Sequence, residues 1–378
     1  MPVLQLENPV RHYAWGSRTV LPTMLGHPVP AAEPWAEIWM GAHPGDPSRL
    51  PDGRSLADVV PGLPFLVKLL AAEQPLSIQA HPSSDQARAG FAAEEARGVP
   101  HGAPQRSYKD PSHKPELLVA LTPVDALCGF RAPAESLRLV RLLGVPRLTA
   151  LAAPLADPDP AAGLRAAFGA LLGLADDERT ALVADVAVAS HAHEADAGPD
   201  ADALDWVARL AVAYPADPGV VAPLLLHLLR LEPGQGIFLR SGVLHGYLHG
   251  AGVEVQASSD NVLRGGLTPK HVDVPELLRV VRFEVAADPV VAARPVAPGV
   301  WSYPVPVADF AVWRVQPGPG SGAGVPLPGS GERIVVCVEG RLDVGALGLT
   351  PGTAAFVAGE EPVVVRGTGT GFVTARGT

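Results

Sequence analysis

The sequence predicts a mainly β protein whose strands are interrupted by a helical insertion. Short apolar runs separated by Gly and Pro occupy residues 1–131 and 233–285, a pattern typical of strands and turns. Residues 132–232 are instead rich in Ala and Leu at helical spacing. From 286 to 378, apolar runs again alternate with turn residues. We therefore predict a β domain formed by 1–131 and 233–285, an all-helical domain over 132–232, and a second small β-barrel domain over 286–378.

Composition points to a soluble protein of the cytoplasm. Hydrophobic residues make up 47% of the 378 residues, but no uninterrupted apolar run approaches the roughly 20 residues that span a bilayer. The N-terminus lacks the basic start and apolar core of a secretory signal, and the two cysteines lie in apolar runs. The net charge of −10 argues against nucleic acid or an anionic membrane as a partner. We expect a monomer.

Residues 1–62 predict short strands and turns. Trp39 is expected to be a packing residue, while Glu37 and His43 nearby can line the mouth of a site. Two buried strands are predicted between residues 63 and 82, over FLVKLL and PLSIQAHP.

Successive side chains of a strand alternate between its faces, so Gln79 and His81 point to one side and can reach one metal ion. Ser77 shares that face and can contact a substrate. A helix with Ser83 as its N-cap is predicted next, over 83–98.

The strand HKPELLVALTP begins with three residues that can carry chemistry, His113, Lys114 and Glu116. A carboxylate at the head of an apolar strand is costly to bury unless it is paired or bound to a cation. We interpret Glu116 as a cation ligand.

Five segments of the insertion have helical spacing. They are AESLRLVRLL (134–143), GLRAAFGALLGL (163–174), DERTALVADVAVASHAH (177–193), DALDWVARLAVAY (202–214) and VAPLLLHLLR (221–230).

The stretch from Gly242 to Val274 concentrates polar residues among glycines. Two strands, 237–244 and 252–258, are predicted with a Gly-rich hairpin over 245–252, which puts His245 at a strand end. A lone histidine there is more often a hydrogen-bonded structural residue than a ligand. Glu254 faces away from the two valines beside it, and therefore into the cavity if the valines pack outward.

Four blocks of the chain resemble the type I mannose-6-phosphate isomerases (phosphomannose isomerases), which are zinc-dependent cupins. The blocks are YAWGS (13–17) with WAEIWMGAHP (35–44), LPFLVKLLAAEQPLSIQAHP (63–82), HKPELLVALTPVDALCGFR (113–131) and VLHGYLHGAGVEVQASSDNVLRGGLTPK (243–270). They occur in the order found in the family. The chain departs from the family pattern beside His245, where Leu244 and Gly246 replace the usual proline and alanine. We interpret the change as altered turn stiffness.

The resemblance implies a jelly-roll cupin metal domain, a helical insertion and a second cupin-like barrel. Residues 286–378 contain no histidine, so we expect the second barrel to be structural. The resemblance also implies one zinc ion per chain, held by Gln79, His81, Glu116 and His245. Such a set leaves the ion positively charged and open to substrate, as in catalytic zinc sites. The implied reaction interconverts D-mannose 6-phosphate and D-fructose 6-phosphate through a zinc-stabilised enediolate.

A sugar phosphate would be repelled by the average surface of this acidic chain, so the site must be locally basic. By resemblance, Arg264 and Lys270 border the phosphate or the enediolate. The candidate proton-transfer groups are Lys68, Lys114, His113 and Asp260. Ser77 and Glu254 are expected to contact the substrate. Asp260 can alternatively be a turn residue that caps its own backbone.

Two other functions stay open at this point. A metal-dependent oxygenase is one, although such sites usually use more than two histidines. A sugar-binding cupin without catalysis is the other.

Overall fold

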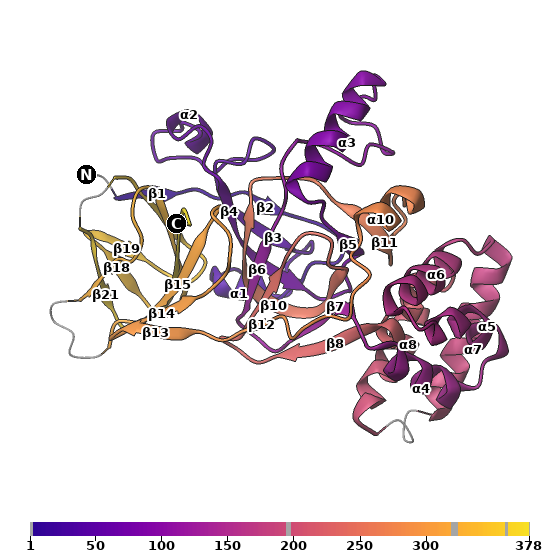
Figure 1. Cartoon of the computed structure of the whole chain (residues 1–378). Coiled ribbons are helices and arrows are strands. Elements are labelled where there is room, and N and C mark those ends of the chain that lie inside the picture. The colour runs from indigo at the N-terminus through magenta and orange to yellow at the C-terminus, as the bar shows by residue number, and fades with distance from the viewer. Residues whose placement is uncertain (1–2, 194–197, 319–323, 360–361, 378) are drawn as a thin grey trace.

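The computed structural model describes residues 3–193, 198–318, 324–359 and 362–377, and its strands form three antiparallel sheets with helices around them (Figure 1). In Figure 1 the helices α4 to α8 lie at one end of the molecule and the C-terminal strands at the other, with the largest sheet between them. In the described residues, no helix is both long and apolar enough to cross a membrane.

The largest sheet has 11 strands. Its main path runs β12-β9-β6-β10-β4-β3-β2, and β5, β7, β8 and β11 pair beside this path. The bounds are β2 (Val10–Arg11), β3 (Glu37–Gly41), β4 (Phe65–Ala72), β5 (Ile78–Ala80), β6 (Glu116–Ala120), β7 (Val124–Phe130), β8 (Leu226–Leu231), β9 (Gly236–Leu239), β10 (His245–Ala257), β11 (Leu263–Gly266) and β12 (Val290–Val291).

Two smaller sheets are built mostly from the C-terminal part of the chain. The 7-stranded sheet has the order β1-β20-β17-β22-β15-β14-β13, and the 4-stranded sheet has the order β16-β21-β18-β19. The bounds are β1 (Val3–Leu6), β13 (Arg294–Ala297), β14 (Val300–Tyr303), β15 (Ala311–Val315), β16 (Val325–Pro326), β17 (Arg333–Glu339), β18 (Leu342–Val344), β19 (Leu347–Leu349), β20 (Ala354–Val357), β21 (Val364–Gly367) and β22 (Thr370–Ala375).

Every element that the structure describes between β7 and β8 is helical. These elements are α4 (Pro133–Leu143), α5 (Pro146–Ala152), α6 (Pro160–Leu172), α7 (Asp176–His193), α8 (Ala201–Ala213), α9 (Ala222–Leu225) and the 3₁₀ turns η1 (Ala153–Ala156), η3 (Gly198–Asp200) and η4 (Pro218–Val221). The other helices are α1 (Val20–Met24), α2 (Leu56–Val59), α3 (Ser84–Ala96) and α10 (Val274–Val280). Ser83 caps α3 as predicted, through a reciprocal capping box with Gln86.

The long strand β10 has an apolar face and a polar face. Val253 and Val255 lie in a core cluster together with Phe356 and Phe372 of the 7-stranded sheet. The two sheets therefore share one apolar core, and the opposite face of β10 is left for polar groups. Glu254 faces away from the valines, which confirms the predicted alternation.

Strands cross the predicted boundary between the two β domains in both directions. β1, from the N-terminal part of the chain, pairs with β20, and Val3 lies opposite Val357. In the other direction β12, which lies beyond residue 285, pairs with β9 of the 11-stranded sheet. Pairing between distant segments carries no local sequence signal, so composition alone could not reveal this exchange of strands.

The hairpin predicted over 245–252 is wrong, because these residues are part of the continuous strand β10. The glycines there allow close packing of neighbouring strands. A Cβ atom on Gly250 would lie 2.4 Å from the carbonyl oxygen of Pro123, and one on Gly252 would lie 2.7 Å from that of Val119. His245 still stands at a strand end, since it is the first residue of β10.

The helix predicted over 221–230 is wrong beyond Leu225. Residues Leu226–Leu231 form β8, which pairs with β7. Leu and Arg favour helices locally, but pairing along the edge of β7 outweighs that weak preference. The helical segment therefore ends before the predicted boundary at residue 232.

We expect Phe356→Ala to lower the free energy of unfolding by about 3–5 kcal/mol, because the ring is 1% exposed in the core shared by two sheets. Bound zinc in the folded fraction should stay unchanged, since the 7-stranded sheet is predicted to contribute stability and no chemistry. Urea unfolding and elemental analysis measure the two quantities. Val296→Ala, at a position 57% exposed, is the control. A loss below about 1 kcal/mol would contradict the shared core.

Candidate metal centre and active-site pocket

Strand pairing gathers the polar residues of three segments into one row. His245 of β10 lies opposite Gln79 of β5, and Gln79 lies opposite Arg264 of β11. Directly opposite residues in a sheet place their side chains on the same face. The row explains how residues far apart in the chain meet at one site.

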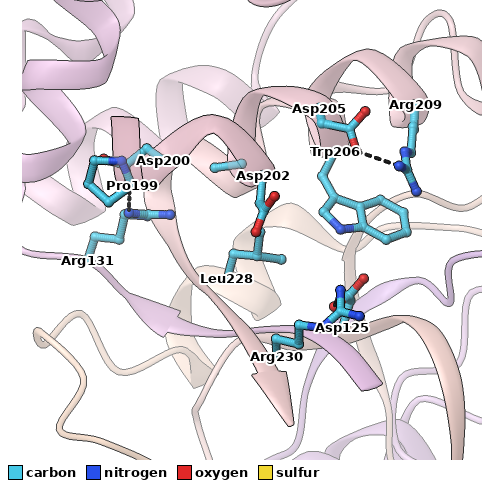
Figure 2. Close-up of a pocket in the computed structure, with 11 residues that line it drawn as sticks. Asp125, Arg131, Pro199, Asp200, Asp202, Asp205, Trp206, Arg209, Leu228 and Arg230 are labelled. Atoms are coloured by element: carbon cyan, nitrogen blue, oxygen red, sulfur yellow. Dashed lines mark hydrogen bonds and ion pairs between the residues drawn. The ribbon is translucent and has the colours of Figure 1, made fainter. Parts of the chain in front are cut away.

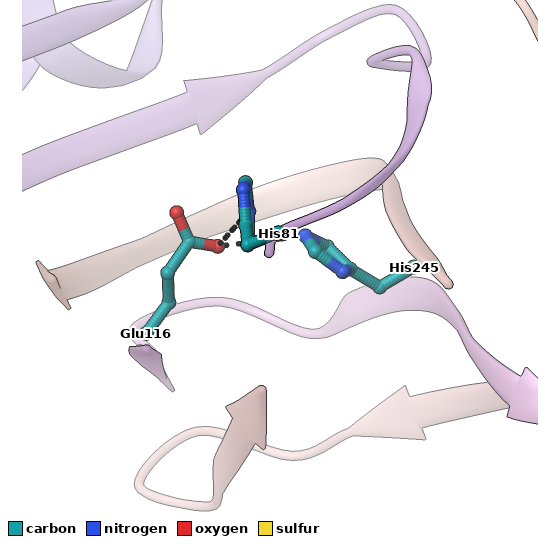
Figure 3. A group of neighbouring side chains, drawn as sticks. All are labelled: His81, Glu116 and His245. Carbon is teal, nitrogen blue, oxygen red and sulfur yellow. Dashed lines mark ion pairs between the residues drawn. The ribbon is translucent and has the colours of Figure 1, made fainter. Parts of the chain in front are cut away.

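Three buried side chains at this end of the sheet form a group that can hold a metal ion (Figure 3). One carboxylate oxygen of Glu116, Oε2, lies 3.4 Å from the Nε2 atoms of both His81 and His245. All three side chains are 1% exposed. These are the three predicted His and Glu ligands, and they come from three separate segments.

Each of the two imidazole rings is hydrogen-bonded through Nδ1, which leaves its Nε2 atom as an acceptor. His81 Nδ1 is 2.7 Å from the carbonyl oxygen of Asn261, and His245 Nδ1 is 3.0 Å from that of Val243. A carbonyl only accepts, so each Nδ1 carries the proton and each Nε2 presents a lone pair. Both Nε2 atoms and Glu116 Oε2 are buried without a hydrogen-bond partner among the described residues.

The charge states also fit a cation. Burial lowers the pKa of His81 to about 4, so the ring is neutral at physiological pH. Burial acts to raise the pKa of Glu116, but the Lys114 ammonium and His81 hold that pKa well below its ordinary value. Imidazole nitrogens and a carboxylate oxygen are ligands that zinc accepts, and a bound cation would satisfy all three acceptors.

A cavity of about 690 Å³ opens onto this group. Nine of the predicted site residues line it: Lys68, Ser77, Gln79, Lys114, Glu116, Glu254, Asp260, Arg264 and Lys270. Lys114 Nζ lies 2.9 Å from Glu116 Oε1, the oxygen that does not face the histidines. The cavity therefore joins the metal group to a set of charged side chains.

Three predicted site residues do not line the cavity: His81 and His245, which belong to the metal group, and His113, which belongs to neither. His113 Nε2 lies 3.0 Å from a carboxylate oxygen of Asp309, in the C-terminal part of the chain. Lys114 and Glu116, which are two residues apart, take the positions that face the cavity. His113 is one residue out of phase with them, which explains its different direction.

A buried charge cluster forms one wall of the cavity. Lys68 Nζ is 3.0 Å from Glu254 and 3.5 Å from Glu37. Trp39 donates its indole N–H to Glu37 at 2.8 Å. Burial acts to lower the pKa of Lys68, but Glu254 and Glu37 raise that pKa above its ordinary value. Lys68 therefore stays protonated, which makes it poorly suited to act as a base.

Glu37 and Trp39 both line the cavity. Glu37 therefore lies at the site, as expected. Trp39, which was expected to be a packing residue, also forms part of the cavity wall. In the sequence, the two-residue spacing of Glu37 and Trp39 indicates that they share one face of a strand. In the structure that strand pairs with β4, and Trp39 lies opposite Lys68.

Two cations lie at another part of the wall without partners. The side chains of Arg264 and Lys270 make no hydrogen bond or ion pair with any residue that the structure describes. Burial lowers the pKa of Arg264, and burial followed by Arg264 lowers the pKa of Lys270. Arg264 is half-buried and Lys270 is exposed, and two neighbouring cations without a described counter-charge favour an anionic ligand. The acidic chain is therefore locally basic here, as the sequence required.

Asp260 also lines the cavity, and its side chain is 52% exposed. Its carboxylate oxygen Oδ1 lies 3.5 Å from His43 Nε2. The alternative role, a turn residue that caps its own backbone, is not what the side chain does here. Asp260 is thus available to a molecule in the cavity.

A second cavity, of about 290 Å³, has its arginines already paired with aspartates (Figure 2). It is lined by residues of α8, β7, β8 and the η3 turn, and by Arg131. Arg131 pairs with Asp200 at 2.8 Å, Arg209 with Asp205 at 2.6 Å and Arg230 with Asp125 at 3.6 Å. Because these arginines are neutralised, the larger cavity is the better anion site.

Known proteins resemble this chain along most or all of its length. A family model described as phosphomannose isomerase type I, catalytic domain, matches residues 3–62 and 53–133. The mannose-6-phosphate isomerase of Escherichia coli (strain K12) is 38% identical over 391 residues, covering 97% of each chain. The enzyme of Homo sapiens is 32% identical and covers 83% of this chain and 82% of its own.

The fold is likewise similar to solved structures. The crystal structure of mannose 6-phosphate isomerase from Salmonella typhimurium bound to substrate (fructose 6-phosphate) and zinc superposes with a TM-score of 0.91, at 36% identity, over 100% of both chains. A zinc-bound mannose 6-phosphate isomerase gives a TM-score of 0.90 at 35% identity.

We expect His81→Ala and His245→Ala to lose bound zinc, because each removes one of three converging acceptors. Elemental analysis of the purified variants measures the metal, and circular dichroism checks the fold. The matched control is His227→Ala on β8, which changes a histidine outside the group. Either ligand variant retaining about one zinc per chain would show that the assignment is wrong.

Proposed function

This chain belongs to the type I phosphomannose isomerase family, and on that premise we propose that its cavity interconverts D-mannose 6-phosphate and D-fructose 6-phosphate. The observation that carries the proposal is the buried group of His81, Glu116 and His245 at the base of a cavity. The same cavity presents Arg264 and Lys270, whose side chains pair with no residue that the structure describes. The first set suits zinc and the second suits a phosphate ester. The relatives do not support the two alternative functions, which were an oxygenase and a sugar-binding cupin without catalysis.

Gln79 is proposed as the fourth zinc ligand. It lines the cavity and lies opposite His245 in the sheet, and its amide oxygen would complete the set of two imidazoles and a carboxylate. Zinc held there supplies a Lewis acid for the oxygens of the opened sugar.

The chain's own side chains then divide the remaining tasks. Arg264 and Lys270 bind the phosphate or stabilise the charge that develops on the enediolate. Lys68 and Glu254, paired at 3.0 Å, hold sugar hydroxyls in place, and Ser77 adds a hydroxyl contact.

Proton transfer between C1 and C2 of the opened sugar requires a base at the cavity wall. Lys114 and Asp260 are the candidates, because both line the cavity, whereas Lys68 is held protonated by its carboxylate partners.

The architecture is proposed to follow the cupin plan. The 11-stranded sheet provides the metal-binding barrel, the helices after β7 form the inserted domain, and the C-terminal strands form a second barrel without chemistry. β1 and β12 are exchanged between the two β domains. The protein is proposed to work as a cytoplasmic monomer.

The proposed function is tested by an assay coupled to fructose 6-phosphate formation from mannose 6-phosphate. Metal-stripped protein should be inactive, and added zinc should restore turnover, since the zinc group lies at the base of the cavity. Magnesium serves as the control ion, because it prefers an octahedral shell of oxygen ligands. Zinc that rebinds to the folded protein without any turnover would rule out the isomerase.

Arg264→Ala separates metal binding from chemistry. We expect the variant to keep its zinc and fold while kcat falls by roughly 10² or more, the scale for losing one electrostatic stabiliser. A rise in KM alone would instead assign Arg264 to phosphate anchoring. Arg230→Ala, in the smaller cavity, is the matched control. Wild-type kcat and KM in Arg264→Ala would remove this arginine from the mechanism.

A further inference from the structure

A partly buried hydrogen-bond network ties residues 259–261 to residues 109–112. The carboxylate of Asp110 lies 2.9 and 3.1 Å from the hydroxyl of Ser259, which donates to it. The same carboxylate accepts the backbone N–H of Asp260 at 2.9 Å. Ser112 donates its N–H to it at 2.9 Å. One side chain therefore fixes two segments that are about 150 residues apart.

Asn261 completes this clamp from the other side. The residue is 0% exposed. Its amide nitrogen donates to the carbonyl oxygens of Asp110 at 2.7 Å and Ser112 at 2.8 Å. Its amide oxygen accepts the N–H of Lys109 at 2.7 Å. A fully buried amide with both ends satisfied has one favourable position, so the loop backbone is fixed.

Both ends of the clamped segment reach the site. The carbonyl oxygen of Asn261 is the partner of His81 Nδ1, and it therefore sets the tautomer and the direction of that ring. Asp260, one residue earlier, lines the cavity. Any shift of this segment would move a metal ligand and a wall residue together.

We propose that Asp110 is a positioning residue of this site, which holds residues 259–261 so that Asn261 orients His81 toward the metal and Asp260 faces the cavity. Asp110 belongs neither to the metal group nor to the cavity lining, and it acts through its neighbours. The effect on zinc affinity is independent of the proposed reaction, whereas the effect on turnover rests on the proposed function.

The test compares two carboxylates that hold the same loop. Asp110→Ala removes the acceptor of the Ser259 hydroxyl and the Asp260 N–H. The matched control is Glu94→Ala, because Glu94 is 5% exposed and accepts the N–H groups of Ser107 at 2.9 Å and Tyr108 at 2.8 Å without contacting residues 259–261. Both variants should unfold at a lower temperature than the wild type.

Zinc affinity, measured with zinc ions against a competing chelator dye, separates the two variants. We expect Asp110→Ala to bind zinc about 10–100-fold more weakly, the usual effect of losing an outer partner of a metal ligand. Glu94→Ala should bind zinc as the wild type does. With zinc saturating, Asp110→Ala should also show a lower kcat and a KM for the sugar phosphate within about twofold of the wild type.

A conservative variant covers the case in which Asp110→Ala does not fold. Asp110→Asn keeps one acceptor oxygen, so its loss of zinc affinity should be smaller but still above about threefold. Wild-type zinc affinity in the folded Asp110 variant, or an equal loss in Glu94→Ala, would overturn the proposal. A wild type that binds zinc but shows no isomerase activity would overturn the proposed function and leave the zinc result valid.

Discussion

The constraint on which the site depends is the burial of three acceptors that face one another without a donor. His81, Glu116 and His245 each direct a lone pair into the same dry space. Such a group is strongly unfavourable unless a cation occupies its centre. The imidazole rings are kept from turning away, because each ring is hydrogen-bonded through its other nitrogen to a backbone carbonyl. The fold thus favours metal binding by destabilising the metal-free state.

The two faces of β10 explain how such a polar site fits inside a β protein. Val253 and Val255 pack into the core shared with the C-terminal sheet, and Glu254 between them faces the cavity. Neighbouring strands follow the same division, so Lys68 is directly opposite Glu254. The apolar face stabilises the sheet while the other face carries a dense set of charges. Changes on one face can therefore be made with little effect on the other.

The sequence was informative wherever the signal was local. The two-residue alternation placed Glu254 correctly, and the Ser83 cap marked the start of α3. Most of the candidate site residues do line one cavity, because the family blocks that suggested them are short strands and their flanks. Local signals failed for the glycines of β10, which serve strand packing, and for β8, where pairing with β7 replaces a helix. For His113, the sequence did not show which face of the strand its side chain takes, because the proline after Lys114 obscures the alternation.

The pairing of β1 with β20 places one of the first and one of the last strands of the chain side by side. A ribosome delivers residues 3–6 long before residues 354–357, so β1 has no native strand partner during almost the whole of synthesis. Closing this pair also joins segments separated by nearly the full length of the chain, which slows folding. The isomerase site can assemble on the nascent chain earlier, because its most distant strand, β11, ends at Gly266. Maturation of the protein would then finish at the 7-stranded sheet, away from the metal group.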